Sequence, residues 1–450
     1  MQALPRKSRD AARLLAAFLS AFASVALVAG AVLAPAATAH ADTVRDGEYW
    51  LSEYGIDKAW NVSKGAGTTV AVIDSGINGG IPDLQGAVAG GTDVSGSGQP
   101  DGQKPIGAEP EHGTLVASVL AGRGHNADGS PVPAGSNGAD GVVGVAPQAH
   151  LLTVSTWLGS ANPAGRTDMQ QIPDAVRWAV DHGAKVINMS LGSSSPDWPP
   201  SWDAAFLYAE QKDVVIVAAA GNRGAGNLQV GAPATIPGVL TVAGLDRQEH
   251  ASVDASSQGV SIGVAAPAEQ LVGDLPDGTY AQWAGSSGAA PIVAGVAALI
   301  RSKWPQMSAD QVINRIVSTA KDAGAPGHDP IYGYGILNAE AALTADVPET
   351  KSNPLGSIAD WIRVHRPDAA AATPVPTPSA TGQPSSEPPL AEPAPPVPAA
   401  AAGTSPWPAL VVLGFGGLIL AILVGGTLHV LGVRRREREK DSETFHKLLQ

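Results

Sequence analysis

Residues 68–74 read Thr-Thr-Val-Ala-Val-Ile-Asp, a run of β-forming side chains that ends in an acid and leads into Ser75-Gly76. An uninterrupted apolar run of this length is typical of a strand buried on both faces of a parallel sheet. The glycine that follows predicts a turn, which leaves Asp74 at the carboxyl end of the strand. Ligands of parallel sheets bind beyond that end, so Asp74 is the first candidate functional residue.

Similar apolar runs recur along the chain and alternate with helical patterns. This alternation predicts an α/β fold, with a mainly parallel central sheet and helices on both faces. Ser190 and the pair Gly221-Asn222 also follow such runs, so we expect them at the same edge of the sheet as Asp74. The further strands are expected at 150–155, 185–190, 214–219 and 239–243, and helices at 169–182, 201–210 and 308–320.

A turn of small residues at 285–291 leads directly into an apolar helix. Ser287 lies in this turn, where the first N–H groups of a helix have no intrahelical partner and the helix dipole places partial positive charge. An anion formed beside its hydroxyl would be stabilised there. Taken alone, Ser287 is more simply interpreted as the cap of a buried helix.

Two further residues complete a possible nucleophilic site. Serine is a weak nucleophile at neutral pH and needs a base in contact, a task for which imidazole has a suitable pKa. Of the ten histidines, only His112 begins a small, apolar helical pattern. Singly, Asp74 is explained as a turn residue and His112 as a helix start. Jointly, the chain order Asp74, His112, Ser287 predicts a catalytic triad in the order found in subtilisin.

The segments around these three residues resemble the signature motifs of the subtilisin-like serine proteases, and the resemblance covers about 65–342. It implies a subtilisin-like three-layer sandwich and a Ser-His-Asp acyl-enzyme mechanism. In that mechanism Asp74 orients the base, His112 acts as general base and then as acid, and Ser287 is the nucleophile.

The same resemblance implies an oxyanion hole and a substrate pocket. Asn222 matches the family's oxyanion-hole asparagine, whose amide acts together with the backbone N–H of Ser287. An alternative interpretation of Asn222 is a turn residue. The residues implied in substrate binding, partly as an added β-strand and partly as a pocket lining, are Ser190, Leu191, Gly192, Ala219 and Gly221.

Three positions depart from the family pattern. Ser286 replaces the usual threonine before the nucleophile, and Gly288 replaces the usual larger residue after it. Ile81-Pro82 stands where a His-Pro pair is common. None of these changes removes a catalytic group, but Gly288 predicts a looser turn at the nucleophile.

Both ends of the chain predict export and membrane anchoring. Basic residues, an apolar stretch and Ala39-His40-Ala41 predict a signal peptide at 1–41; an uncleaved anchor is the alternative. A strap at 42–64 precedes a peptidase domain at 65–345 and a Pro/Ala-rich linker at 346–408. Uncharged residues 409–433 predict one C-terminal transmembrane helix. The basic tail 434–450 is then cytoplasmic, and the catalytic domain lies outside the membrane.

The composition excludes several other functions. The chain has 450 residues and a formal net charge of −13, and because both ends are basic its body is still more acidic. Nucleic-acid binding needs a basic surface, so no nucleic-acid partner is expected. Without cysteine there is no disulfide or thiolate site. The loop acids lack metal-ligand spacing, so neither a metal nor a cofactor is expected; they are Asp93, Asp101, Asp128 and Asp140.

The whole arrangement most resembles the mycosins, membrane-anchored subtilases of actinobacterial type VII secretion systems. The resemblance implies an endopeptidase that processes exported proteins, with protein or peptide substrates and the secretion membrane complex as partners. Two alternatives stay open at this point. One is a mainly structural component that stabilises the secretion complex, and the other is a general degradative protease tethered to the cell.

Overall fold

The computed structural model describes residues 43–133, 135–366 and 397–398. The expected signal peptide (1–41), membrane span (409–433) and tail (434–450) lie outside these residues, as does most of the linker. Within the described part, no helix is both long and apolar enough to cross a bilayer. The described residues all belong to the first of two compact units, 1–399, and the second unit, 400–450, lies outside them.

A seven-stranded, fully parallel sheet forms the centre of this unit, in the order β2-β5-β1-β6-β7-β8-β9. Strand β1 (Thr69–Asp74), third in this order, is buried from Val70 onward, as its apolar run predicts. Four of the other strands confirm the sequence expectation: β5 (His150–Ser155), β6 (Val186–Met189), β7 (Val215–Ala219) and β8 (Leu240–Leu245). The outer strands are β2 (Val88–Asp93) and β9 (Ile262–Pro267).

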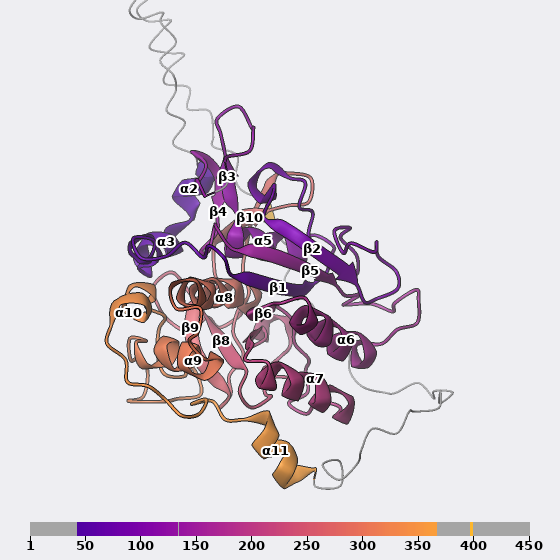
Figure 1. Cartoon of the computed structure of the whole chain (residues 1–450), viewed down its shortest axis with the longest axis vertical. Helices are drawn as coiled ribbons and strands as arrows, with labels where there is room; N and C mark the ends of the chain where they lie inside the picture. Colours follow the sequence, from indigo (N-terminus) through magenta and orange to yellow (C-terminus); the bar gives the residue numbers. More distant parts are fainter. Residues whose placement is uncertain (1–42, 134, 367–396, 399–450) are drawn as a thin grey trace, which may run out of the picture. The chain divides into compact units, whose positions relative to one another are not determined.

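Helices cover the sheet on both faces, as Figure 1 shows. On one face α8 (Ser286–Lys303) packs across β6 to β9, with α5 (His112–Ala121) and α9 (Ala309–Ser318) beside it. On the other face lie α6 (Asp168–Asp181), against β1 and β5, and α7 (Pro200–Gln211), against β7. Residues 286–301 of α8 are all buried because the helix is apolar on every side. The α/β layering is therefore confirmed.

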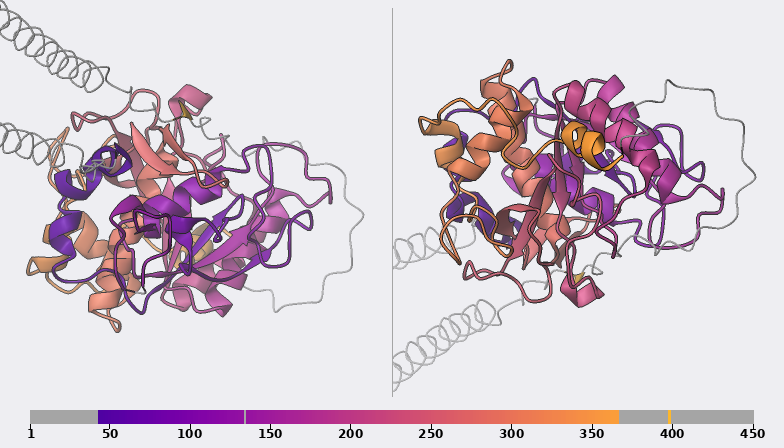
Figure 2. Two further views of the ribbon diagram at one scale, coloured as in Figure 1. Left: turned by 90° about the horizontal axis from the view of Figure 1, so that it is seen from above. Right: turned by 90° about the horizontal axis from the view of Figure 1, so that it is seen from below.

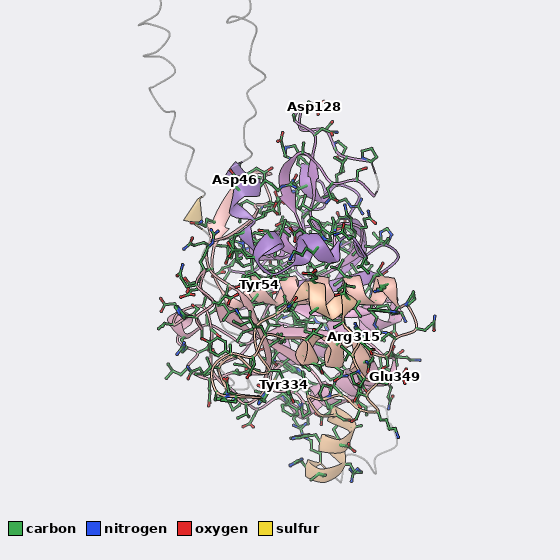
Figure 3. The ribbon with its side chains drawn as sticks, turned by 90° about the vertical axis from the view of Figure 1, so that its left-hand side faces the viewer. Asp46, Tyr54, Asp128, Arg315, Tyr334 and Glu349 are labelled. Atoms are coloured by element: carbon green, nitrogen blue, oxygen red, sulfur yellow. The ribbon has the colours of Figure 1, made fainter. Side chains whose placement is uncertain are left out.

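The strap is part of the core. It forms three short helices, α2 (Thr43–Gly47), α3 (Tyr49–Glu53) and α4 (Ile56–Ala59), and Figure 3 labels Asp46 and Tyr54 along it. Trp50 and Ile56 are fully buried. The Tyr49 hydroxyl donates to the carbonyl of Glu269 at 2.7 Å, and Ala339 N–H, at the start of α10 (Ala339–Thr344), donates to the carbonyl of Tyr54 at 3.0 Å.

The smaller elements lie at the edges of the core. Two short pairs of strands are antiparallel, β3 with β4 and β10 with β11, and β12 pairs with β11. Their bounds are β3 (Arg123–His125), β4 (Asp140–Val143), β10 (Leu271–Asp274), β11 (Tyr280–Trp283) and β12 (Val397–Pro398), and the 3₁₀ turns are η1 (Pro82–Leu84) and η2 (Arg223–Ala225).

The start of the expected linker differs from the sequence expectation. Residues 358–365 form α11 (Ile358–His365), which lies beside α7 (Figure 2). Ile358 is buried, and the rings of Trp361 and Trp198 lie 4.4 Å apart. Arg366 then pairs with Asp203 of α7 at 2.6 Å. The packed domain therefore extends to Arg366, and the boundary expected at 345 was wrong, because the apolar side of this short helix outweighs the Pro- and Ala-rich composition that follows.

Candidate active site

Asp74 and His112 meet at the carboxyl end of the sheet. Asp74 ends β1 and His112 begins α5, and His112 Nδ1 lies 2.8 Å from Asp74 Oδ1. Both side chains are buried. The first turn of α5 can lie this close to the end of β1 because residue 113 is a glycine. A Cβ there would lie 2.3 Å from the carbonyl oxygen of Gly76. The turn after β1 and the first turn of α5 are thus in direct contact.

The Asp74 contact sets the proton arrangement of the imidazole. An ionised carboxylate only accepts, so Nδ1 carries the proton and Nε2 presents its lone pair. Nε2 is buried without a hydrogen-bond partner. Burial acts to lower the pKa of His112, but the charge and hydrogen bond of Asp74, helped by Glu109 and Glu111, raise that pKa above its usual value. The ring is therefore a base held in one tautomer and strengthened by its neighbour.

Ser287 lies in the first turn of α8, as the sequence predicts. Its Oγ donates to the carbonyl of Ser190 at 3.3 Å, and only 5% of the residue is exposed. Ser287 Oγ and His112 Nε2 are not hydrogen-bonded in this state, since Nε2 has no partner. Nucleophile and base commonly tighten their contact only when substrate binds. A rotation of the serine hydroxyl away from Ser190 would free it for that contact.

Asn222 lies next to the nucleophile turn with its amide orientation fixed. Its Oδ1 accepts the N–H of Ser286 at 2.9 Å and lies 3.0 Å from Ser286 Oγ. Ser286 Oγ in turn accepts the N–H of Gly221 at 3.0 Å. Because Oδ1 is occupied by these groups, Nδ2 remains as a donor. The hydroxyl of Ser286 thus provides this contact in place of the usual threonine.

Two hydrogen-bond donors are left at this turn. The first-turn N–H of Ser287 has no intrahelical acceptor, and Asn222 Nδ2 is the second donor. Gly285 keeps the space between them open, since a Cβ there would lie 3.2 Å from Asn222 Nδ2. Its φ of +149° also favours glycine.

The expected substrate-binding residues lie around this centre. Ser190 Oγ donates to the carbonyl of Ser287 at 2.7 Å, so the segment after β6 is bonded to the nucleophile turn. Ser190 and Leu191 line a small pocket with Asp74, His112 and Leu158. Ala219 ends β7, and Gly221 with a φ of +95° turns the chain toward Asn222. A Cβ at Gly192 would meet nothing within 4 Å, so the backbone there is open to a partner.

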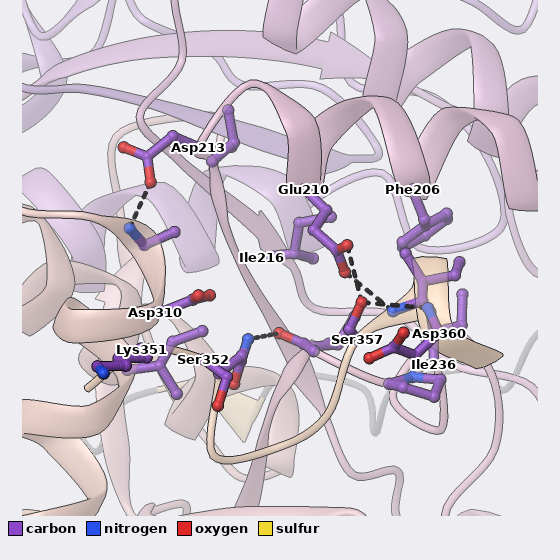
Figure 4. A pocket seen from close by; sticks show the side chains of 18 residues that line it. Phe206, Glu210, Asp213, Ile216, Ile236, Asp310, Lys351, Ser352, Ser357 and Asp360 are labelled. Carbon is purple, nitrogen blue, oxygen red and sulfur yellow. Dashed lines mark hydrogen bonds between the residues drawn. The ribbon is translucent and has the colours of Figure 1, made fainter.

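A larger cavity of about 300 Å³ lies elsewhere, between α7, α9 and residues 351–360 (Figure 4). Its polar groups bind one another: Glu210 accepts the hydroxyl of Ser357 at 2.9 Å, and Asp213 accepts the N–H of Ala309 at 2.6 Å. No histidine lines it. The serine hydroxyls of this cavity therefore have no imidazole base beside them.

In the described residues, no group of three or more His, Asp or Glu side chains is arranged to hold a metal ion. The loop acids bind their own loops instead. Asp93 accepts from Ser95 and from the N–H of Gly96, and Asp128 accepts from Ser130. Their carboxylate oxygens therefore serve turn formation.

Three side chains around the site were not anticipated from the sequence. Trp283 of β11 packs edge-to-face on the His112 ring, with ring centroids 5.9 Å apart. Leu271 of β10 pairs with Trp283 in register. Asn188 of β6 donates to Ser190 Oγ at 3.0 Å. Of the three, only Asn188 could have been noticed in the sequence, because it is a polar residue in an otherwise apolar strand. The contacts of Trp283 and Leu271 join distant parts of the chain.

Comparison with known proteins agrees with this geometry. The model of the subtilase family, peptidase S8, matches residues 65–335. Subtilisin DY of Bacillus licheniformis is 36% identical over 286 residues, which cover 62% of this chain and 92% of that protein. MycP1 from Mycobacterium smegmatis has 30% identity and a TM-score of 0.55, covering 68% of this chain and 86% of that structure. MycP3 protease from the type VII (ESX-3) secretion system has 31% identity and a TM-score of 0.53, covering 66% and 88%. With its parallel sheet, its buried Asp74–His112 pair and the family match over 65–335, the chain belongs to the subtilase family and is a subtilisin-like serine protease.

Proposed function

We propose that Asp74, His112 and Ser287 form the catalytic triad of this protease, with Asn222 and the Ser287 N–H as its oxyanion hole. The observation that carries this proposal is the 2.8 Å contact from His112 Nδ1 to Asp74 Oδ1, which leaves Nε2 unpaired. His112 also lines a pocket with Ser190, the hydrogen-bond partner of Ser287. Nε2 takes the proton of Ser287 Oγ as this oxygen attacks the scissile carbonyl, and returns it to the leaving amine. Water then hydrolyses the acyl-enzyme by the reverse proton route.

Substrate is bound in an extended conformation along 190–192. The open backbone at Gly192 suits pairing with a peptide strand, because main-chain hydrogen bonds give affinity without demanding a particular side chain. Leu191, Ala219 and Gly221 form the walls of the pocket for the residue before the cut bond.

At the level of the cell, the chain is an extracytoplasmic, single-pass membrane protease that processes exported proteins of a type VII secretion system. Support comes from the likeness to MycP1 and MycP3, the latter described as part of such a system, and from the apolar stretch 409–433 with basic residues after it. The secretion membrane complex is its proposed partner.

The test is Ser287→Ala in the full-length chain, with Ser302→Ala as control. Ser302 is partly buried near the far end of the same helix, where its hydroxyl donates to the carbonyl of Ala66. We expect cleavage of exported proteins, mapped by their new N-termini, to stop in the first variant only. Cleavage by Ser287→Ala at the wild-type rate would refute the triad. If Ser287→Ala restores secretion in a deletion strain, the main role is structural rather than proteolytic. Broad degradation of casein would indicate a general degradative enzyme.

A further inference from the structure

The side chain of Trp283 lies between the imidazole and the nucleophile turn. Trp283 ends β11 and is 3% exposed. Its ring plane makes an angle of 85° with that of His112, an edge-to-face arrangement favoured by aromatic rings. The ring of His112 has one hydrogen bond, through Nδ1, so this contact is a second constraint on its orientation.

The six-membered ring of the indole reaches the residue after Ser287. A Cβ at Gly288 would lie 3.3 Å and 3.4 Å from Cη2 and Cζ2 of Trp283, and 2.2 Å from Cδ1 of Leu271. The indole and the leucine therefore fill the volume that a side chain at position 288 would take. This packing is possible because Gly288 has no side chain. Trp283 therefore packs against the turn that carries Ser287.

Packing alone does not explain a tryptophan at this position. Its Nε1 is buried and has no hydrogen-bond partner, which is unfavourable compared with a phenylalanine of similar shape. The indole is longer than a phenyl ring. Its Nε1 lies 3.2 Å from the position that a Cβ would take at Gly273, and the side chain extends from there to the first turn of α8.

We propose that Trp283 is a positioning residue that fixes the imidazole of His112 and the turn of Ser287 relative to each other. The proposal rests on the roles proposed above for His112 and Ser287. Hydrogen bonds hold the imidazole only on its Asp74 side, and Trp283 supplies the constraint on a second side. Catalysis is sensitive to such constraints, since a misplacement of about 1 Å can cost about 10²-fold in rate.

The first experiment compares Trp283→Ala and Trp283→Phe in the full-length protein. We expect Trp283→Ala to lower kcat about 10- to 100-fold with KM changed less than about twofold, a loss in proportion to the misplacement. Opening the ring to water weakens both the burial that lowers the pKa of His112 and the Asp74 charge that raises it, so the acid limb of the pH–rate profile should also move. Trp283→Phe should restore the original limb, because a phenyl ring can still pack on the imidazole, but only part of kcat, because it is too short to reach the first turn of α8.

The matched control is Trp202→Ala on α7. Trp202 is equally buried, has an unpartnered Nε1, and stacks on Phe206 on the other face of the sheet. We expect it to lower thermal stability by an amount similar to Trp283→Ala while kcat and the pH–rate profile of the folded protein stay unchanged. Equal changes in kcat and the profile for both variants would show that Trp283 acts through general stability, and would overturn the proposal.

The second experiment tests whether Leu271 and Trp283 fill the space beside Gly288. It does not require the Trp283→Ala variant to fold. Gly288→Ala should reduce kcat, because its Cβ collides with Leu271. Combination with Leu271→Ala should recover much of that loss, and combination with Trp283→Phe part of it. Strictly additive effects would refute the packing argument.

The two proposals can be told apart. If Ser287→Ala abolishes cleavage while Trp283→Ala keeps the wild-type kcat and pH–rate profile, the positioning role of Trp283 is wrong and the catalytic triad stands. If Ser287→Ala still cleaves, both proposals fail.

Discussion

Ser190 and Ser287 are joined by two hydrogen bonds in opposite directions. The hydroxyl of Ser190 donates to the carbonyl of Ser287 at 2.7 Å, and the hydroxyl of Ser287 donates to the carbonyl of Ser190 at 3.3 Å. The first bond holds the substrate-binding segment on the nucleophile turn, while the second keeps the nucleophile in a resting position. Substrate binding therefore needs to break only the longer of the two.

Ser190→Ala tests the shorter bond. The carbonyl of Ser287 would lose its partner inside the protein, which costs about 1–3 kcal/mol for a buried group. We expect a fall of this size in the free energy of unfolding, together with a lower kcat because the turn loses a fixed point. Urea titration measures the first effect and peptide hydrolysis the second. Ser193→Ala, three residues on and partly exposed, should change neither by a comparable amount.

Asn222→Ala should reduce kcat by about 10²–10³-fold, the range found when subtilisin loses its corresponding donor. KM should change little, because the amide acts on charge that develops only in the transition state. Ser286→Ala is the companion variant: it keeps the Asn222 amide but removes the hydroxyl 3.0 Å from its Oδ1. We expect a smaller loss there, and none for Ser286→Thr. A large fall in activity for Ser286→Thr would contradict this account.

The raised pKa of His112 predicts the pH dependence of the reaction. The base works only when neutral, so kcat/KM should rise with pH through a value above about 6.5, the usual histidine pKa. In Asp74→Asn burial would act without the opposing charge, and the acid limb should move to lower pH. Activity should also fall by about 10⁴-fold, because the ring loses its tautomer control. An acid limb unchanged by Asp74→Asn would show that Asp74 does not set the pKa of the base.

Asp274 of β10 predicts a pH dependence of stability. Burial, then the charge and hydrogen bond of Asp83, and then Glu48 raise the pKa of Asp274 well above its usual value. The folded chain therefore holds a proton that the unfolded chain releases at about pH 3.8, the usual pKa of aspartate. Stability from this group falls as pH rises from there to the folded-state pKa.

Asp274→Asn should remove this decline, because an amide stays neutral and keeps the shape of the protonated acid. Urea unfolding of both forms between acidic and alkaline pH is the measurement. We expect the variant to be the more stable form at the alkaline end. Parallel curves for the two proteins would mean that Asp274 releases its proton without consequence for folding.

The sequence was sufficient for features that rest on local pattern. Strand β1 was predicted because its apolar run is continuous, and Ser287 because small residues precede an apolar helix. Strand β2 was not, since Gly90 and Gly91 interrupt its pattern and the strand is only partly buried. Helix α11 was missed because it is short and adjoins a Pro-rich segment.

Features that rest on contacts between distant residues were out of reach. Gly288 predicted a loose turn, but the space beside it is filled by Leu271 and Trp283 from a strand pair. The Trp283 contact with His112 joins residues 171 positions apart, for which sequence offers no periodicity. The orientation of Asn222 likewise depends on Ser286, which reaches it only in the folded chain.

Helix α11 has a mechanical consequence. Arg366, directly after this helix, has its guanidinium held by Asp203 and by the carbonyl of Trp198. These contacts tie this part of the chain to α7, on the face of the sheet opposite α8. Residues 397–398, in contrast, pair with β11, the strand that carries Trp283, so a displacement of β12 would be transmitted to the His112 ring more directly than a displacement of α11.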